Sequence, residues 1–294
     1  MWEKVIRVFE QAAWANRASP LRRGNVVCVP TGCEMIIAGD LHGHGANLLR
    51  IQALAGELGG TLDGPEPGRH VVLQELIHPH GEQLSPAGQD GSHHVLTRAV
   101  RWQLQFPGRV HVILGNHELA QMTGQDILKG GASVNQSFVD SVRRHYRDEA
   151  DDVLAAMNNY FASLPLAVRR NSDLAVVHSL PADRQCEQFD ATVFDRPIRP
   201  DDLTRTGPAY QLVWGRTFGR PAIDRIRQAL RVSLLIVGHQ PQPTGVTVLA
   251  PDAMIIASDH DHGVALKLGP SPVGSADDLA RSNIVQLASV QMPS

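Results

Sequence analysis

The sequence lacks the features that mark secreted, membrane-spanning and nucleic-acid-binding chains. It has three cysteines, Cys28, Cys33 and Cys186, and no CxxC pair. This argues against a disulfide framework or a structural zinc site and favours reduced thiols packed in the core of a cytoplasmic protein. Lys and Arg total 27 against 30 Asp and Glu, so the net charge of -3 shows no basic excess of the kind that binds nucleic acid or anionic lipid.

Long hydrophobic runs are also missing. No apolar stretch is long enough to cross a membrane. The first residues place Trp2, Val5 and Phe9 at helical intervals with charged residues between them, which differs from the unbroken apolar region of a signal peptide. We therefore expect neither a membrane nor a nucleic acid as a partner, and the oligomeric state is left open.

Histidine, in contrast, is abundant. The chain has 294 residues, 43% of them hydrophobic, which suits a globular protein with a sizeable core. It contains 14 histidines beside only 5% aromatic residues. Because neutral imidazole is the commonest side-chain metal ligand, the positions of these histidines indicate where a metal site would lie.

Short β-branched runs alternate with amphipathic stretches in the first half of the chain. The pattern predicts strands at 25–29, 34–39, 70–74 and 109–115 and helices at 45–58 and 94–106. This βαβαβ order predicts an α/β fold with a largely parallel, buried sheet.

The second half is less regular. A helical stretch is expected at 134–164 with a break near Asp148, followed by a strand at 173–179, a long surface loop at 181–209, a helix at 222–230 and a strand at 233–239. Short strands at 245–250, 253–258 and 263–268 suggest antiparallel additions at a sheet edge or a second sheet. We expect one domain over 1–270 with a helical insertion near 122–165, and a tail at 271–294 that frays.

Polar side chains follow five of the predicted strands. In an open α/β sheet, ligands bind beyond the carboxyl ends of the strands. A single histidine there is more often hydrogen-bonded packing than a ligand, but five such positions favour a common site. Carboxylates and imidazoles without thiolates indicate Mn, Fe, Zn or a similar ion. The residues that follow the five runs are Asp40, His42 and His44; Glu75 and His78; Asn116, His117 and Glu118; His178; and His239 with Gln240.

Four of these segments, GDLHGHG, GNHE, VVHS and VGHQP, occur in the order that resembles the calcineurin-like metallophosphoesterases. The resemblance runs from about residue 35 to residue 268 and is closest to the phosphoprotein phosphatase (serine/threonine phosphatase-like) branch and its bacterial relatives. It implies a four-layer α/β/β/α sandwich with two central mixed sheets and metals at the strand ends. It also implies a hydrolase that cleaves phosphomonoesters with a metal-activated water.

The resemblance assigns roles to individual residues. Two divalent ions are implied, Mn before Fe or Zn, with Asp40 and His42 on the first. His117 would be the general acid that protonates the leaving oxygen. The ligands of the second ion would be Asn116, His178 and His239.

The second family motif, similar to GDxVDRG, is replaced here by QELIHPHG. Glu75 stands where the bridging Asp would be and keeps a carboxylate. His78 replaces the Asp that usually orients the catalytic imidazole, so His117 needs another acceptor, either Glu118 or an aspartate of SDHDHG. Pro79 replaces a phosphate-binding Arg. Arg216 is the candidate substitute, and an ordinary surface arginine is the alternative.

Other polar residues have simpler expectations. We expect Arg143 and Arg144 to lie on a solvent-exposed helix face of the insertion. Residues 260–262 are expected to form an exposed turn, with a rim of the active site as the alternative. The loop composition around His80, His93 and His94 predicts that these histidines are exposed to solvent.

Two classes of function follow. The first is a phosphoesterase acting on a phosphorylated protein or, alternatively, on a dinucleoside polyphosphate or another small phosphate ester. The second is a degenerate module that binds metal or phosphate with little turnover. The retained ligand positions favour the enzyme.

Overall fold

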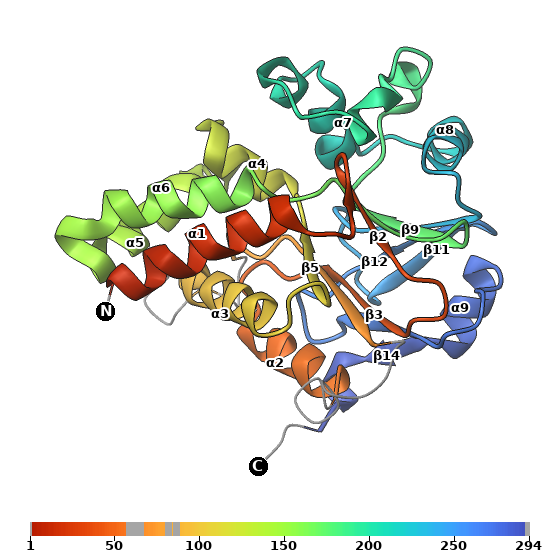
Figure 1. The fold of residues 1–294 in the computed structure, drawn as a ribbon, viewed down its shortest axis with the longest axis horizontal. Coiled ribbons are helices and arrows are strands. Elements are labelled where there is room, and N and C mark those ends of the chain that lie inside the picture. Colours follow the sequence, from red (N-terminus) through yellow and green to blue (C-terminus); the bar gives the residue numbers. More distant parts are fainter. Residues whose placement is uncertain (1, 57–67, 80–83, 85–88, 292–294) are drawn as a thin grey trace.

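Two mixed β-sheets form the centre of the computed structural model, which describes residues 2–56, 68–79, 84 and 89–291 (Figure 1). The seven-stranded sheet has the order β1 (Arg22–Arg23), β2 (Val26–Val29), β8 (Ala167–Arg170), β9 (Leu174–Val177), β10 (Leu234–Val237), β12 (Ala253–Ile256) and β11 (Val246–Ala250). The five-stranded sheet has the order β14 (Ile284–Gln286), β13 (Val264–Leu268), β3 (Met35–Asp40), β4 (His70–Gln74) and β5 (Val110–Ile113).

The strands that matter for function run in parallel. β3, β4 and β5 are parallel neighbours in one sheet, and β9, β10 and β12 are parallel neighbours in the other. β11 and β13 extend these parallel cores as antiparallel strands, as expected. The strand expected at 253–258 does not follow the same expectation, because β12 runs parallel to β10. Beyond β3 and β12 the two sheets approach each other, where Ser258 N–H donates to Asp40 O at 3.0 Å.

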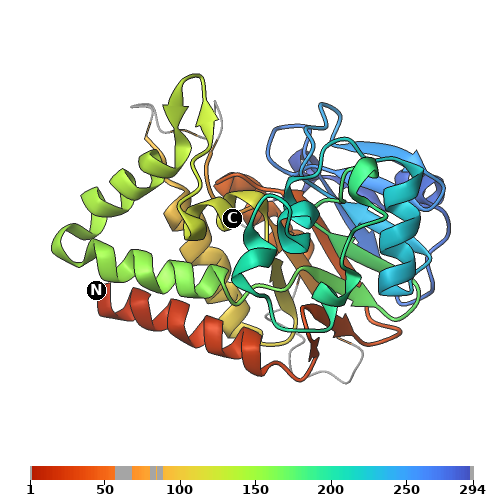
Figure 2. The same cartoon turned by 90° about the horizontal axis from the view of Figure 1, so that it is seen from above.

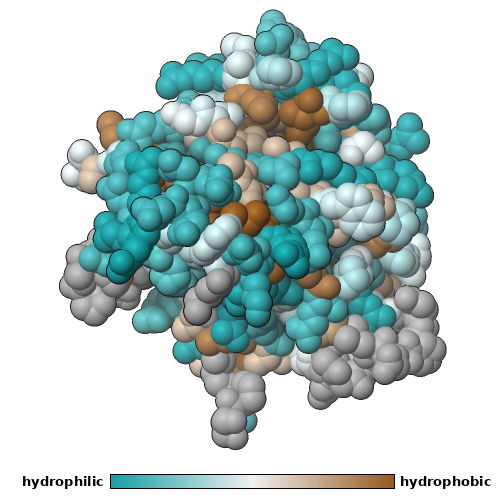
Figure 3. All heavy atoms as spheres, turned by 60° about the vertical axis from the view of Figure 1, so that its left-hand side comes forward, coloured by the Kyte–Doolittle hydropathy of each residue, from teal (hydrophilic) through white to brown (hydrophobic). Residues whose placement is uncertain are grey.

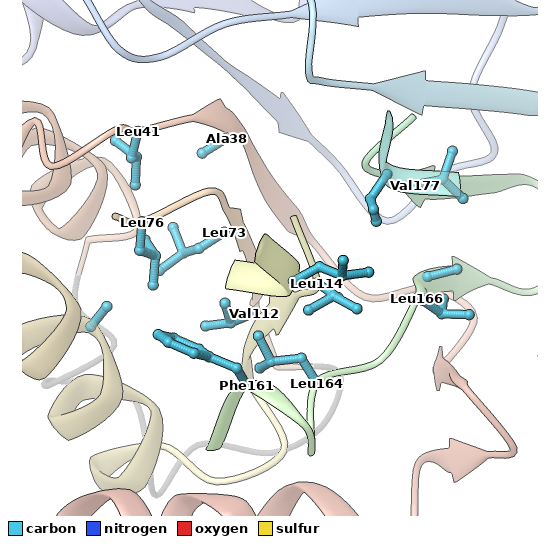
Figure 4. Packing of buried hydrophobic residues seen from close by; sticks show 14 of the residues in the cluster. Ala38, Leu41, Leu73, Leu76, Val112, Leu114, Phe161, Leu164, Leu166 and Val177 are labelled. Atoms are coloured by element: carbon cyan, nitrogen blue, oxygen red, sulfur yellow. The ribbon is translucent and has the colours of Figure 1, made fainter. Parts of the chain in front are cut away.

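Alternating side chains build two hydrophobic cores. On β3, Met35 and Ile37 join a cluster with residues of both sheets, while Ile36 and Ala38 join the cluster that includes the helices. Figure 4 shows Ala38 in this second cluster together with Val112 from β5 and Phe161. The continuous apolar runs that predict buried strands thus reflect burial on both faces.

Helices cover the outer faces of both sheets. α2 (Gly45–Leu54) packs on β3 and α3 (Ser92–Gln105) on β5, while α8 (Arg220–Leu230) packs on β10. α1 (Trp2–Ala18) lies along α6 (Ala150–Phe161) and contacts α3 (Figures 1 and 2). These layers confirm the predicted four-layer α/β/β/α architecture.

The segment between β5 and β8 carries the helical insertion and a projecting hairpin. α4 (Asn116–Thr123) leads into β6 (Leu128–Lys129) and β7 (Ala132–Ser133), which form a hairpin that projects from the body of the molecule (Figure 2). The hairpin is followed by α5 (Val134–Tyr146), the 3-10 turn η2 (Arg147–Glu149) and α6. The break predicted near Asp148 is therefore present, whereas the hairpin was not predicted.

Two segments differ from the expectation. Residues 181–209, expected as a surface loop, contain the turns η3 (Asp183–Gln185), η4 (Ala191–Phe194) and η5 (Pro200–Leu203), and α7 (Pro208–Trp214) begins in it. Phe189, Val193 and Phe194 of this segment are buried. Apolar residues between prolines and aspartates thus anchor the segment to the core.

The predicted fraying of the C-terminal segment is wrong for residues 270–291, the part of this segment that the structure describes. Ser275 caps α9 (Ala276–Ser282) by accepting from Asp278 N–H at 3.2 Å, and β14 and the turn η6 (Leu287–Ser289) follow. Leu279 and Leu287 are buried, so the segment completes the core and the edge of the five-stranded sheet.

The face of the molecule in Figure 3 is mainly hydrophilic, with small separate hydrophobic areas. Within the described ranges, we find no helix that combines the length and the hydrophobicity needed to cross a bilayer. Cys28, Cys33 and Cys186 are free thiols, and the burial of Cys33 and Cys186 agrees with the predicted core packing.

Candidate active site

A small cavity lies where the carboxyl ends of the central strands meet. Its volume is about 110 Å³. β3, β4, β5 and β10 each supply lining residues at the carboxyl end of the strand or within a few residues of it, and His178, which follows β9, is fully buried beside them. The lining consists of Asp40, His42, Glu75, Asn116, His117, Lys129, Arg216, His239, Gln240, Pro241, Ala257 and Asp259. Most of the strand-end residues predicted to share one site are therefore brought together. His44 is an exception, because it lies outside the lining and caps α2 by accepting from Asn47 N–H at 3.1 Å.

Two groups of side-chain atoms that could hold a metal ion lie in this region. One group consists of Asp40, His42 and Glu75, and the other of Glu75, His178 and His239. Within each group the ligand atoms lie within 4.8 Å of one another, and all five side chains are buried. Glu75 belongs to both groups, which is the position that a shared ligand would need.

The hydrogen bonds of His178 show that its Nε2 atom is a hydrogen-bond acceptor. Gln74 Nε2 donates to Ala38 O at 3.1 Å, which leaves Gln74 Oε1 to accept from His178 Nδ1–H at 2.9 Å. In this tautomer His178 Nε2 carries a lone pair, yet it lies 2.8 Å from Glu75 Oε2. Burial lowers the pKa of His178, so the contact needs either a proton on the Glu75 carboxyl, whose pKa is raised, or a bound cation. Asn116 Oδ1 also lies 3.0 Å from His178 Nε2, and oxygens gathered around a nitrogen lone pair fit a cation.

Other buried acceptors point to the same conclusion. Asp40 Oδ1 and His239 Nε2 have no hydrogen-bond partner among the described residues. Burial raises the pKa of Asp40 and of Glu75 to about 8, because a carboxylate is costly to ionise away from water. Since the donors are oxygen and nitrogen without thiolates, the site fits borderline or hard divalent ions.

The backbone around the site is strained. His42, Glu75, His78 and His239 have positive φ angles of 42°, 49°, 62° and 67°. Left-handed conformations at residues other than glycine cost free energy and often occur where a side chain must be aimed at a site. Gly238 is also required, because a Cβ there would lie 2.4 Å from Asp40 Oδ1 and 2.5 Å from Gln74 Oε1.

His117, in the first turn of α4, is oriented by another histidine. His78 Nε2 lies 3.1 Å from Gln121 Oε1, so this nitrogen carries the proton and His78 Nδ1 is an acceptor. His117 Nδ1–H donates to it at 2.9 Å, which leaves Nε2 as the nitrogen for the reaction. The predicted acceptor, Glu118 or an aspartate of residues 258–263, is wrong for this bond: Glu118 Oε1 accepts from Leu76 N–H at 2.7 Å. His78, which replaces the family's orienting Asp, takes over that position.

Two cations line the cavity. Arg216 lines the cavity, which is the position that a substitute for the missing motif Arg would need. Much of the Arg216 side chain is exposed to solvent. Lys129 reaches the cavity from the β6–β7 hairpin and was missed by the sequence analysis, because no motif surrounds it. Partial burial lowers the pKa of Lys129, and the nearby Glu75, Asp259 and Asp40 raise it.

The remaining predicted positions differ in their exposure to solvent. Arg143 pairs with Asp151 at 3.2 Å on the exposed face of α5, and Arg144 is also exposed, as predicted. Asp261 and His262 form the exposed turn that was predicted. His260 is half-buried and its Nε2 lies 2.8 Å from Gln242 O.

Of the three histidines expected in solvent, His94 is exposed and His80 lies outside the described residues. His93 contradicts the prediction, since it is 2% exposed. It lies one residue earlier than the helix predicted at 94–106, but the observed α3 begins at Ser92 and turns this side chain inward.

Comparison with known proteins agrees with this geometry. A probable serine/threonine-protein phosphatase of Encephalitozoon cuniculi is 28% identical over 240 residues, which cover 76% of this chain and 46% of that protein. The chain thus spans less than half the length of this relative.

Solved structures share the fold. A protein serine/threonine phosphatase from Saccharomyces cerevisiae, with similarity to human phosphatase PP5, matches with a TM-score of 0.66 and 17% identity over 96% of this chain and 88% of that chain. A cold-active protein-tyrosine phosphatase from a psychrophilic Shewanella species matches with a TM-score of 0.56 and 17% identity over 87% and 79% of the two chains.

The family model described as calcineurin-like phosphoesterase matches residues 34–243, which include every strand-end residue of the cavity up to His239. The expected enzyme class, a hydrolase of phosphate esters, is the class of this family. The resemblance of the motifs is confirmed, and the chain belongs to the calcineurin-like phosphoesterase family.

Proposed function

We propose that this protein is a metal-dependent phosphomonoesterase that acts on phosphoserine or phosphothreonine in a cytoplasmic protein. The observation that carries the proposal is the pair of metal-ligand groups sharing Glu75, with His117 in the wall of the same cavity. The relative in Encephalitozoon cuniculi, described as a probable serine/threonine-protein phosphatase, supports this choice of substrate.

The metal ligands we propose are those at the strand ends. Asp40 and His42 would hold one divalent ion, with Glu75 shared between the two. Asn116, His178 and His239 would hold the other. Mn²⁺ is the first choice, with Fe or Zn as alternatives, because carboxylate and imidazole donors suit all three. When bound, such ions lower the pKa of an attacking water and offset charge on the phosphoryl oxygens.

Protein side chains would supply the proton for the leaving oxygen and would bind the phosphate. His117 donates a proton from Nε2 to the leaving oxygen, while His78 holds the opposite nitrogen. Arg216 and Lys129 place positive charge at the cavity and bind the non-bridging oxygens of the phosphate. Together they would take over the role of the phosphate-binding Arg of the family motif, at whose position this chain has Pro79.

The size of the cavity favours a phosphoprotein over a dinucleotide. A volume of about 110 Å³ accommodates a phosphate group but is well below the several hundred Å³ typical of sites that enclose a drug-sized ligand. A phosphorylated side chain can enter such a cavity while the rest of its protein stays outside. The alternatives, a dinucleoside polyphosphate or small-molecule phosphoesterase and a module with little turnover, become outcomes of the test.

The test compares substrates and variants. Metal-stripped protein supplied with Mn²⁺ should hydrolyse para-nitrophenyl phosphate and a phosphoserine peptide, and Glu75→Gln should lose both activities. His117→Ala should lose about 10²- to 10⁴-fold on the peptide and much less on para-nitrophenyl phosphate, because nitrophenolate leaves readily without a proton. Arg143→Ala, on the exposed face of α5, is the control and should match the wild type.

Each contrary outcome is distinct. Equal losses on the two substrates would contradict the acid role of His117. Turnover of diadenosine tetraphosphate in preference to the peptide would replace the phosphoprotein proposal by the dinucleotide one. Bound Mn²⁺ without turnover of any substrate would identify the silent module.

A further inference from the structure

A second cluster of histidines lies outside the active site. His93 and His94 stand in the first turn of α3, and His145 stands in the last turn of α5. The ring centroids of His93 lie 3.9 Å from His94 and 5.3 Å from His145, and those of His94 and His145 are 4.8 Å apart. One nitrogen of each ring lies within 4.8 Å of the other two. Three imidazoles from two helices are thus arranged around a common point.

The buried member of the cluster presents an unpaired acceptor. The Ser141 hydroxyl donates to Asp90 O, so its oxygen is free to accept from His93 Nδ1–H at 3.4 Å. This tautomer leaves a lone pair on His93 Nε2, which has no hydrogen-bond partner among the described residues although the side chain is 2% exposed. Buried acceptors are normally satisfied, and a ligating histidine usually donates its other N–H to a neighbour, as His93 does to Ser141.

The electrostatic state of the rings suits a cation rather than an anion. Burial lowers the pKa of His93 to about 3, with further lowering from His94, His145 and Arg144. Burial and His145 also lower the pKa of His94. At neutral pH both rings are therefore neutral, and a neutral imidazole nitrogen attracts a cation and repels the oxygens of an anion.

We propose that His93, His94 and His145 form a second metal site, which binds a divalent ion of the zinc class and joins α3 to α5. Three imidazoles without a carboxylate suit Zn²⁺, Co²⁺, Ni²⁺ or Cu²⁺ better than Mg²⁺, Ca²⁺ or Mn²⁺. This site differs from the active site both in place and in ligand chemistry, and it does not depend on the proposed function.

The site is accessible and needs only small adjustments. His94 and His145 are exposed and line an open groove of about 650 Å³ between the helices, through which an ion can enter. Zinc–nitrogen bonds of 2.0–2.1 Å in tetrahedral geometry place ligand nitrogens roughly 3.3 Å apart. Rotation of the two exposed rings that moves their nitrogens by about 1 Å would therefore bring all three nitrogens within bonding distance of one ion. A water would occupy the fourth position. Arg98 and Arg101 line the same groove and limit the affinity.

The position of the site connects it to the active-site loop. Ser92, the neighbour of His93, accepts from His78 N–H at 3.2 Å through its hydroxyl, and His78 orients His117. An ion held by α3 and α5 would therefore fasten the helical insertion to the element that supports this loop. We expect binding to stabilise the folded protein, because the unfolded chain does not hold the three rings together.

The test measures metal binding directly, with Mn²⁺ present in excess to occupy the active site. Equilibrium dialysis against Zn²⁺ should find one more bound ion in the wild type than in His94→Ala or His145→Ala. Both substitutions are at exposed positions, which avoids the risk that replacement of buried His93 prevents folding. His262→Ala removes an exposed histidine that belongs to neither helix and should bind as much Zn²⁺ as the wild type.

A spectroscopic and a thermal readout complete the experiment. Co²⁺ in place of Zn²⁺ should give the intense visible absorption of a tetrahedral ion in the wild type and in His262→Ala, and not in His94→Ala or His145→Ala. Zn²⁺ at 100 times its dissociation constant should raise the stability of the wild type by about 2.7 kcal/mol and leave that of His145→Ala unchanged. Equal Zn²⁺ stoichiometry in all four proteins would overturn the proposal.

Discussion

At the scale of single residues, a chain of two imidazoles replaces the usual pair of imidazole and carboxylate. His78 accepts from His117 Nδ1–H and is itself fixed by Gln121, which lies one turn after His117 on α4. A neutral imidazole fixes the tautomer as a carboxylate does, but it offsets less of the positive charge that forms when His117 is protonated. His78 is thus a positioning residue for the proposed acid.

Substitution of His78 should separate positioning from binding. In His78→Ala, His117 loses its acceptor, so we expect kcat on a phosphoserine peptide to fall about 10- to 100-fold with little change in KM. His78→Asn should recover part of the loss, because the Asn carbonyl oxygen lies where His Nδ1 was and Asn tolerates the positive φ of 62°. Steady-state kinetics with the pH profile of kcat provides the measurement. A similar loss in both variants would contradict the positioning role.

The strand-end residues could be found from the sequence because their position follows from two regularities. Parallel strands end at one edge, and an apolar run marks where each strand ends. Asp40, Glu75, Asn116, His178 and His239 were placed together on this basis, and the structure places them together, while their roles as ligands remain predictions.

Residues whose role depends on a side-chain partner were harder to find. In the sequence, His78 is recognisable only as the replacement of an orienting Asp. The sequence does not show that its ring accepts a hydrogen bond from His117. Gln74 was read as the last residue of a strand, although its amide fixes the tautomer of His178. Lys129 has no motif at all. Each depends on distances between segments that are far apart in the chain.

At the scale of elements, the β6–β7 hairpin is the unpredicted element with the greatest consequence for the site. Two residues in each strand are too few to give an alternating pattern, so only Gly130 and Gly131 mark the turn, with φ angles of 57° and 83°. The α9–β14 segment was mistaken for a tail for a related reason: its few apolar residues, Leu279 and Leu287, are spread among polar ones.

The hairpin should contribute to substrate binding through Lys129. Lys129→Ala removes a charge from the cavity wall, so we expect KM for a phosphopeptide to rise about tenfold, with a smaller change in kcat. Lys129→Arg keeps the charge and should stay closer to the wild type. Lys267→Ala, at an exposed lysine on β13, serves as the matched control and should leave KM unchanged. The role would be refuted by an unchanged KM in Lys129→Ala at low ionic strength.

At the scale of the whole molecule, the site concentrates acidic groups in the interior where the two sheets meet. Asp40, Glu75 and Glu118 are at most 5% exposed. The pKa of each is raised to about 8, mainly by burial and, for Glu118, also by the nearby Glu75. Without a cation, the folded protein therefore holds protons that the unfolded chain has already released at neutral pH, and folding and metal binding become coupled.

The stability of the metal-free protein should consequently fall as the pH rises from 7 to 8. In this range the folded carboxyl groups, with pKa values of about 8, still bind protons, whereas the same groups in the unfolded chain, near pH 4, are ionised. Each such group lowers the free energy of unfolding on the order of 1 kcal/mol per pH unit, and the decline levels off above about pH 8. His93 and His111 act in the opposite direction, because burial lowers the pKa of both to about 3 while the unfolded chain, with histidine pKa values of about 6.5, still binds some protons at pH 7. This contribution fades towards pH 8, so the fall in stability is clearest in the upper part of the range.

Urea unfolding at pH 7.0, 7.5, 8.0 and 8.5 with a chelator measures this slope, and Mn²⁺ supplies the contrast. Glu118→Gln should reduce the slope by the share of one group, since Glu118 belongs to neither ligand group and its replacement leaves the metal site intact. With Mn²⁺ present the decline should disappear or reverse, because the ion favours the ionised carboxylates and binds more tightly as protons are released. A flat or rising stability of the metal-free protein between pH 7 and 8 would show that the buried carboxyl groups are ionised without a metal, and that other groups of the protein compensate their charge.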